Sequence, residues 1–198
     1  MTSRRTVRDV PRRPLIAVVL AAACTFAAVA DAASAEDAGE RRSASAPSER
    51  SRVSTTAPPG ICPSTHHGAA VDQDAQRAWL CVDGIPVDEL PVTGAITQPD
   101  AGTYAVFAKD AISTSTTHGR PSSMTHFVAF TYGKYRGARI AFHAVPTFDS
   151  DGALVQPLST VGDLGMRGES GGCFRVLPVD AERIWSFLEI GDEVRVLN

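Results

Sequence analysis

The stretch GGCFRVLPVDAERIWSFLEIGDEVRVLN, residues 171–198, contains the clearest secondary-structure signals of the chain. Its middle part predicts an amphipathic helix, because three apolar residues recur at i, i+3 and i+4: Ile184, Phe187 and Leu188. Asp180 is placed to cap the first turn of this helix, and Gly191 is placed to end the element. The last residues, DEVRVLN, then predict a closing β-strand.

The segments before this stretch indicate a mostly β domain. RAWLCVDGIPVDELPV (77–92) consists of two apolar runs around Asp83-Gly84, which is the pattern of a β-hairpin. GTYAVFAK (102–109) alternates through Tyr104, Val106 and Ala108 and predicts another strand. Two further β-rich runs, 124–133 and 138–145, flank the turn-like GKYRG. Many short strands with one short C-terminal helix predict a β-sandwich or barrel-like fold.

The N-terminus has the order of an export signal. MTSRRTVRDVPRR contains five arginines, residues 14–30 are apolar, and Ala33-Ser34-Ala35 fits the small-x-small cleavage rule. We expect a signal peptide over residues 1–35, with cleavage after Ala32 as the alternative to cleavage after Ala35.

Three other readings of this N-terminus stay open. SRRTV is a partial twin-arginine signal, and Cys24 is a candidate for lipidation. The 17 apolar residues also approach the ~20 that span a bilayer, so an uncleaved segment would tether the protein to a membrane. Each reading places the rest of the chain outside the cytoplasm, in the cell envelope or secreted.

A linker follows the signal and precedes the domain. Residues 36–60 contain almost no large apolar side chain, so they cannot bury enough surface to offset their ordering entropy. We therefore expect a disordered linker within residues 36–68 and one globular domain over residues 69–198. The formal net charge of −3, with no basic block in the domain, gives no reason to expect nucleic-acid binding.

The cysteine count leaves one thiol unpaired. If Cys24 leaves with the signal, then Cys62, Cys81 and Cys173 remain in an oxidising compartment. A disulfide between Cys62 and Cys81 would pin the start of the domain to the strand RAWLCV and leave Cys173 free. The alternative is that all three are buried free thiols.

Cys173 has the sequence context of a nucleophile. A free thiol is mostly protonated at neutral pH and is usually activated by a nearby histidine. His143, at the end of the strand IAFHAVP, is the first candidate base, and His126 is the second. Either histidine is also compatible with a structural role. His118, in the loop-like TTHGR, is expected to be solvated.

The residues around Cys173 fit acyl transfer. Gly171 and Gly172 let the backbone turn tightly, and backbone N–H groups beside a nucleophile can bind an oxyanion. Arg175, two residues further on, could bind a carboxylate if it points to the same side as Cys173, as strand spacing would allow. No metal site is expected, because Cys62 with His66 and His67 lacks a zinc spacing.

These segments, read in order, resemble the L,D-transpeptidase (YkuD) catalytic domain family. IAFHAVP, ESGGCFRV and DAERIWSFLEIGDEVRV match the family's histidine strand, its Ser-His-Gly-Cys motif, and its short helix with a final strand. The resemblance spans about residues 70–198. It implies that Cys173 is the nucleophile and His143 the general base. It also implies that Ser170, Gly172 and Arg175 are motif positions, and that Met124 lies in the substrate pocket.

The resemblance also implies an activity. The family attacks a peptidoglycan stem tetrapeptide at its third residue, a diamino acid, releases D-alanine and forms a 3→3 cross-link. It uses no metal or organic cofactor, is sensitive to carbapenem β-lactams, and contributes to cell-wall organisation and cell shape. Two alternatives are an inactive wall-binding module and an L,D-carboxypeptidase that transfers the acyl group to water.

This chain departs from the family pattern at two places near the motif. Gly171 stands where the motif has a histidine, so local shape and electrostatics must differ. The 26 residues between His143 and Ser170 are also numerous, which predicts an inserted loop beside the site. In the stretch TQPDAGTY, residues 98–102 replace the family's Thr-Pro-x-Gly.

Overall fold

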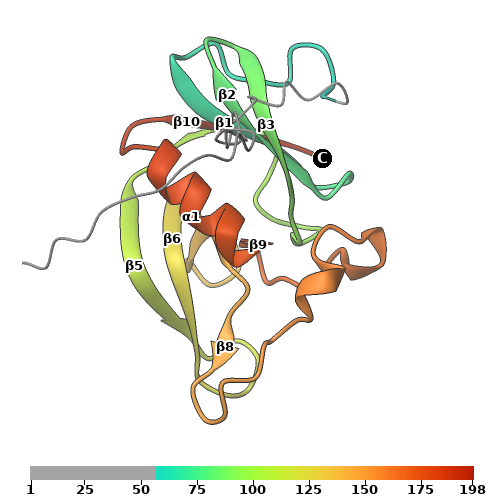
Figure 1. The fold of residues 1–198 in the computed structure, drawn as a ribbon, viewed down its shortest axis with the longest axis vertical. Helices are drawn as coiled ribbons and strands as arrows, with labels where there is room; N and C mark the ends of the chain where they lie inside the picture. The colour runs from blue at the N-terminus through green and yellow to red at the C-terminus, as the bar shows by residue number, and fades with distance from the viewer. Residues whose placement is uncertain (1–56) are drawn as a thin grey trace, which may run out of the picture. The chain divides into compact units, whose positions relative to one another are not determined.

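The computed structural model describes residues 57–198, which form two β-sheets and one α-helix (Figure 1). The first sheet contains, in spatial order, β3 (Ile85–Pro91), β2 (Arg77–Val82), β1 (His67–Asp72), β10 (Glu193–Leu197) and β4 (Gly102–Ala105). The second contains β5 (Ala108–Ser115), β6 (Ser122–Tyr132), β7 (Arg139–Ala144) and β9 (Phe174–Val176), with β8 (Thr147–Phe148) paired to β6. The mostly β fold expected from the sequence is confirmed. The expected signal peptide, Cys24 and most of the linker lie outside the described residues.

The hairpin predicted around Asp83-Gly84 is confirmed. β2 and β3 are antiparallel, and Val82 pairs with Ile85 across the two-residue turn. Asp83 has φ 50° and Gly84 has φ 79°. Positive φ at both central residues is the geometry of the tight turn that matches the twist of paired strands.

The expected single strand over residues 102–109 was wrong. The chain forms β4 in the first sheet and β5 in the second, and it changes sheet at Val106 and Phe107. The Val106 N–H donates to Asp192 O at 2.9 Å, and the Phe107 N–H donates to Ala129 O at 2.9 Å. Because both halves alternate with the same period, the pattern alone cannot show that their partners lie in different sheets.

The C-terminal helix α1 (Pro178–Phe187) packs on β6 and β7 (Figure 1). It begins after Leu177 with proline at its first position, where a missing N–H costs nothing. The expected cap by Asp180 was therefore wrong, since this residue lies inside the first turn and contacts Arg183 at 3.3 Å. The predicted apolar face holds: Ile184 and Leu188 are buried in the core. That core lies between the sheets and the helix and includes Val71, Leu80, Leu90, Val128, Phe130, Phe142, Phe174, Val176 and Val194.

The 26 residues after His143 connect two parallel neighbours, β7 and β9. They contain β8 and two short 3-10 helices, η1 (Leu158–Thr160) and η2 (Leu164–Met166). A parallel pair needs such a crossover, because its second strand must start at the same end of the sheet as the first. Within residues 57–198, no helix has both the length and the apolar character that crossing a membrane requires.

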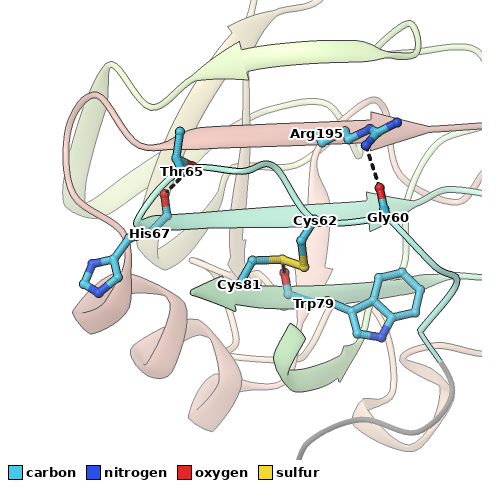
Figure 2. The surroundings of a disulfide bond; sticks show 7 residues. All are labelled: Gly60, Cys62, Thr65, His67, Trp79, Cys81 and Arg195. Carbon is cyan, nitrogen blue, oxygen red and sulfur yellow. Dashed lines mark hydrogen bonds between the residues drawn. A yellow bond between two sulfur atoms is a disulfide. The ribbon is translucent and has the colours of Figure 1, made fainter. Parts of the chain in front are cut away.

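The domain begins before the expected boundary at residue 69. β1 starts at His67, and Ile61 and Cys62 are buried against Trp79. Arg195 on β10 donates to Gly60 O at 2.7 Å, which holds this entry segment over the first sheet (Figure 2). Part of the segment assigned to the linker therefore packs on the domain.

A disulfide joins Cys62 in this entry segment to Cys81 on β2 (Figure 2). Its two residues are separated by 19 positions, and Cys81 is fully buried. Cys173 is the free cysteine of the described residues. The bond thus ties the start of the domain to β2, next to the edge strand β3 of the first sheet.

We predict that reducing this disulfide lowers the free energy of unfolding by about 3 kcal/mol, since a loop of this length restricts the unfolded chain by that amount. Urea unfolding with and without dithiothreitol measures the change. The double variant Cys62→Ala/Cys81→Ala is the matched control, and dithiothreitol should leave its stability unchanged. Equal stability of the oxidised and reduced wild type would contradict the prediction.

Candidate active site

The pairing of β7 with β9 places the candidate residues on one face of the second sheet. Phe142 pairs with Phe174 and His143 pairs with Arg175 in parallel register. Successive side chains of a strand alternate between faces, so the two phenylalanines enter the core while His143 and Arg175 share the opposite face. Cys173, two residues before Arg175, packs on that same side with Met124, Phe127 and Ala141.

A cavity of about 420 Å³ opens over this face. Seven of the residues expected at the site line it: Cys173, His143, Ser170, Gly171, Gly172, Arg175 and Met124. The lining also includes Arg136 and Arg139 but no aspartate or glutamate. Arg139 is paired with Asp110 at 2.6 Å, which leaves Arg136 and Arg175 as the guanidinium groups of the lining without an ion pair among residues 57–198. A concave site with this excess positive charge favours an anionic ligand.

The Cys173 thiol is half-buried and neutral. Its Sγ donates to Arg139 O at 3.6 Å, so the thiol faces the backbone of β7. Burial disfavours the thiolate and raises the pKa of Cys173 to about 11, although the Ala141 backbone and Arg175 act in the opposite direction. The resting site therefore contains a thiol.

The His143 imidazole is buried and also neutral. Its ring stacks on Phe127, and its Nδ1 lies 2.7 Å from Ala144 O. A carbonyl can only accept, so Nδ1 carries the proton and Nε2 keeps its lone pair. Burial lowers the pKa of His143 to about 4. Among residues 57–198, no hydrogen bond joins His143 to Cys173.

Arg175 is buried and has only neutral hydrogen-bond acceptors. Its Nη1 donates to Gln156 Oε1 at 3.2 Å, and its Nη2 donates to His118 Nε2 at 3.0 Å and to Glu169 O at 2.8 Å. No ion pair to Arg175 occurs within the described part of the chain. Desolvation lowers the pKa of Arg175, as expected for a buried cation, although Cys173 and the Glu169 carboxylate act in the opposite direction.

The loop before Cys173 is held by two polar side chains. Ser170 Oγ donates to Cys173 O and accepts from the Gly172 N–H at 3.3 Å. Gln98 Nε2 donates to Gly171 O, and Gln98 Oε1 accepts from the Lys134 N–H at 3.0 Å. These contacts fix the backbone of residues 170–173, which carries the Cys173 thiol.

Three residues of this site were not found from the sequence: Gln98, His118 and Gln156. His118 was expected to be a solvated loop residue; its side chain remains exposed in part but contacts Arg175. Gln156 lies inside the 26-residue crossover, which has no periodic or motif signal. Gln98 lies in the stretch that departs from the family's Thr-Pro-x-Gly, so the resemblance assigns no role to its side chain. Their roles come from contacts with segments distant in sequence.

The other histidines lie elsewhere. His126 is half-buried with φ 55°, and its ring meets Trp185 of α1 edge-on, so it does not line the cavity. His66 stacks on His67 and contacts Asp83 at 3.1 Å. No group of three or more potential metal ligands occurs among residues 57–198.

We predict that alkylation of Cys173 by iodoacetamide is slow at pH 7 and accelerates continuously past pH 9. The raised pKa of Cys173 leaves roughly one thiol in 10⁴ ionised at neutral pH, and each pH unit up to about 11 multiplies the thiolate tenfold. Peptide mass mapping against pH follows the reaction at this residue alone. A rate that levels off below pH 8 would show a thiolate already stabilised in the resting site.

Two neighbouring glycines provide a matched pair of variants. Gly172 has φ 148°, and a Cβ there would lie 2.9 Å from Gln98 Nε2 and 3.1 Å from Ile140 Cδ1. Gly171→Ala meets only the Thr117 methyl at 3.5 Å, an ordinary contact. We expect Gly172→Ala to lower the free energy of unfolding by about 1–3 kcal/mol and Gly171→Ala to leave it nearly unchanged. Urea unfolding tests both, and equal effects would show that Gly172 is not constrained.

Comparisons with known proteins agree with this architecture. The family model described as the L,D-transpeptidase catalytic domain, YkuD, matches residues 67–196. No curated protein sequence matches the chain.

The chain is also similar to solved L,D-transpeptidase structures with a TM-score of 0.50. One from Mycobacterium smegmatis is 20% identical, and the match covers 67% of this chain and 59% of that chain. L,D-transpeptidase 3 from Mycobacterium tuberculosis, in complex with a faropenem-derived adduct, is 18% identical, with 67% and 60% covered. A mutant Enterococcus faecium enzyme is 21% identical, with 66% and 49% covered. This chain thus spans about three fifths or less of those proteins. The family model covers well over half of the chain, which therefore belongs to the YkuD family of L,D-transpeptidase catalytic domains.

Proposed function

We propose that the protein is an exported peptidoglycan L,D-transpeptidase that forms 3→3 cross-links through a Cys173 thioester. The observation that carries the proposal is the shared cavity: a free thiol, an imidazole with an unoccupied nitrogen and an unneutralised guanidinium line one hollow on one sheet face. Membership of the YkuD family supports the class of reaction. The donor substrate, the acyl acceptor and the location outside the cytoplasm are parts of the proposal.

The first chemical step uses the neutral pair. As Cys173 Sγ attacks the carbonyl carbon of the third stem residue, its proton passes to His143 Nε2. The tetrahedral intermediate collapses when the C–N bond breaks, and the same proton goes to the departing D-alanine amine. The acyl group is left on sulfur as a thioester. An amine of a second stem then attacks, its proton is taken up by His143, and the thiol is restored.

The sheet geometry allows this proton transfer. Cys173 directly precedes β9, and extending the β7–β9 register by one residue places it two residues along the sheet from His143. A strand spacing of about 4.8 Å and a rise of about 3.3 Å per residue put the two Cα atoms about 8 Å apart. For the proton to pass, the Cys173 thiol must rotate away from Arg139 O toward the imidazole.

The charge of the cavity supports a peptide donor with a free carboxyl end. The terminal D-alanine carboxylate would neutralise Arg175, whose present partners are neutral. The backbone N–H of Cys173 is the candidate for binding the oxyanion, since the Gly172 N–H already donates to Ser170 Oγ. The same thiol would be acylated by carbapenems, and the Mycobacterium tuberculosis relative was solved with an adduct derived from faropenem, another β-lactam.

The test is incubation of the full chain with a stem tetrapeptide, with and without an acceptor amine, followed by mass spectrometry. A dimer with loss of D-alanine supports transpeptidation, and D-alanine release without a dimer would identify an L,D-carboxypeptidase. Retention on peptidoglycan with no product would identify a wall-binding module. Intact mass should also show one carbapenem adduct, which Cys173→Ala abolishes. An adduct that survives this substitution would overturn the thioester.

We predict that His143→Ala lowers kcat for tetrapeptide turnover by about 10²–10⁴-fold, the usual contribution of a general base. Circular dichroism and urea unfolding should show a folded protein, because His143 is not part of the hydrophobic core between the sheets and the helix. The rate of iodoacetamide alkylation at high pH should stay near that of wild type, since ionised thiol needs no base. Unchanged kcat would remove His143 from the mechanism.

A further inference from the structure

The turn between β5 and β6 is built so that His118 faces Arg175. Gly119, with φ 77°, closes a turn in which its N–H donates to Thr116 O at 3.1 Å. The Thr117 N–H donates to Ser115 Oγ at 3.1 Å, which fixes the preceding residue. A short turn with these internal contacts has few alternatives for its side-chain directions.

Arg120, the residue after this turn, anchors it to the crossover. Its guanidinium lies 3.6 Å from the centre of the Phe148 ring and donates to Asp151 Oδ2 at 3.0 Å. The Asp149 N–H donates to Pro121 O at 3.1 Å. The turn is thus tied to the segment that follows β8. Its residues Thr117 and His118 form one side of the cavity.

The hydrogen bond between His118 and Arg175 fixes the tautomer of the imidazole. Arginine only donates, so His118 Nε2 must accept and Nδ1 must carry the proton. A protonated ring would put two cations at 3.0 Å and lose the acceptor. Burial, followed by the charge of Arg175, lowers the pKa of His118, which keeps the ring neutral at neutral pH.

Gly171 leaves room for this arrangement. A Cβ at Gly171 would meet only Thr117 Cγ2, at 3.5 Å. Thr117 of the turn therefore lies on the side of the Cys173 loop toward which a side chain at position 171 would project. Thr117 and His118 both line the cavity. The cationic end of the cavity is therefore shared between β9 and this turn.

We propose that His118 is a positioning residue of this site: its neutral imidazole orients the Arg175 guanidinium for binding a carboxylate of the donor peptide. This inference rests on the proposed function. Gln156 holds Nη1 of the same guanidinium and the Glu169 carbonyl shares Nη2, so His118 supplies the one contact that comes from a surface turn. Without it, the buried cation keeps its charge but loses one of the acceptors that fix its direction.

The first test compares three variants of the full chain in turnover of the tetrapeptide L-alanyl-γ-D-glutamyl-meso-diaminopimelyl-D-alanine. His118→Ala should raise KM by about 10-fold or more, the cost of one hydrogen bond to a charged group, while kcat changes little. His118→Gln, whose amide oxygen can accept from Arg175, should restore most of the affinity. His66→Ala, an exposed histidine paired with Asp83, is the matched control and should behave as wild type. A wild-type KM in His118→Ala would overturn the proposal.

The pH profile separates orientation from simple packing. The groups facing His118 are Arg175, Glu169 and, across the cavity, His143. Because the pKa of His118 lies below 6.5, its contact with Arg175 is intact at and above that pH and is lost as pH falls through the lowered value. KM of wild type should rise over this range, and KM of His118→Gln should not. A rise of equal size in both variants would assign the titration to another group.

A readout independent of catalysis keeps this inference distinct from the proposed function. Nitrogen-15 NMR of the full chain should show His118 as the Nδ1–H tautomer at neutral pH, and the Arg175→Lys variant should shift its Nε2 resonance. An Nε2–H tautomer would overturn the role of His118 even in an active enzyme. If the tautomer is as expected but no tetrapeptide is turned over, the proposed function fails and the His118–Arg175 contact stands.

Binding of the same tetrapeptide to Cys173→Ala, with and without His118→Ala, then tests the positioning role of His118. Equal dissociation constants for the two proteins would overturn this role.

Discussion

Three parallel residue pairs between β7 and β9 determine the site. They set Phe142 beside Phe174, His143 beside Arg175 and Ala144 beside Val176. A shift of β9 by one residue would turn Cys173 and Arg175 toward the apolar core and place Phe174 in the cavity, because side chains alternate at every residue. The aromatic rings behind the sheet oppose such a shift: Phe142 and Phe174 lie 5.5 Å apart, and each also packs on Phe130.

The crossover between these strands does more than connect them. Gln156 joins the crossover to Thr93 and to Arg175: its amide nitrogen donates to Thr93 Oγ1 at 2.9 Å, and its amide oxygen accepts from Arg175. Thr93 in turn pairs with the backbone of Arg175 through two hydrogen bonds, of 2.8 and 2.9 Å. The cation is consequently oriented by a network whose members come from three separate segments. Such networks hold a buried charge only when each member is satisfied.

What could be predicted from the sequence depended on whether the signal was local. The hairpin at Asp83-Gly84 and the apolar face of α1 were predicted because their determinants lie within a few residues. The grouping of Cys173 with His143 and Met124 was expected through the resemblance, and the structure places these residues around one cavity.

What could not be predicted arose from contacts between distant segments. The contact of His118 with Arg175 spans 57 positions, and that of Gln98 with Gly171 spans 73. Periodicity contains no information about such pairs. The break between β4 and β5 was missed for the same reason, since alternation continues while the pairing partner changes from β10 to β6. The expected cap at Asp180 failed because Pro178 already starts the helix.

The electrostatics of the cavity constrain how the proposed reaction can begin. Arg175 lowers the pKa of both Cys173 and His143, so it favours the thiolate and disfavours the imidazolium. These effects oppose each other when a proton moves from sulfur to nitrogen, and a carboxylate that neutralised Arg175 would weaken both. Binding of such a carboxylate therefore changes the proton-transfer equilibrium little. With a thiol pKa of about 11 beside an imidazole pKa of about 4, a separate thiolate–imidazolium pair is disfavoured before attack. In the proposed reaction the proton would then leave sulfur as the S–C bond forms, and Arg175 would act by orienting the donor rather than by activating the nucleophile.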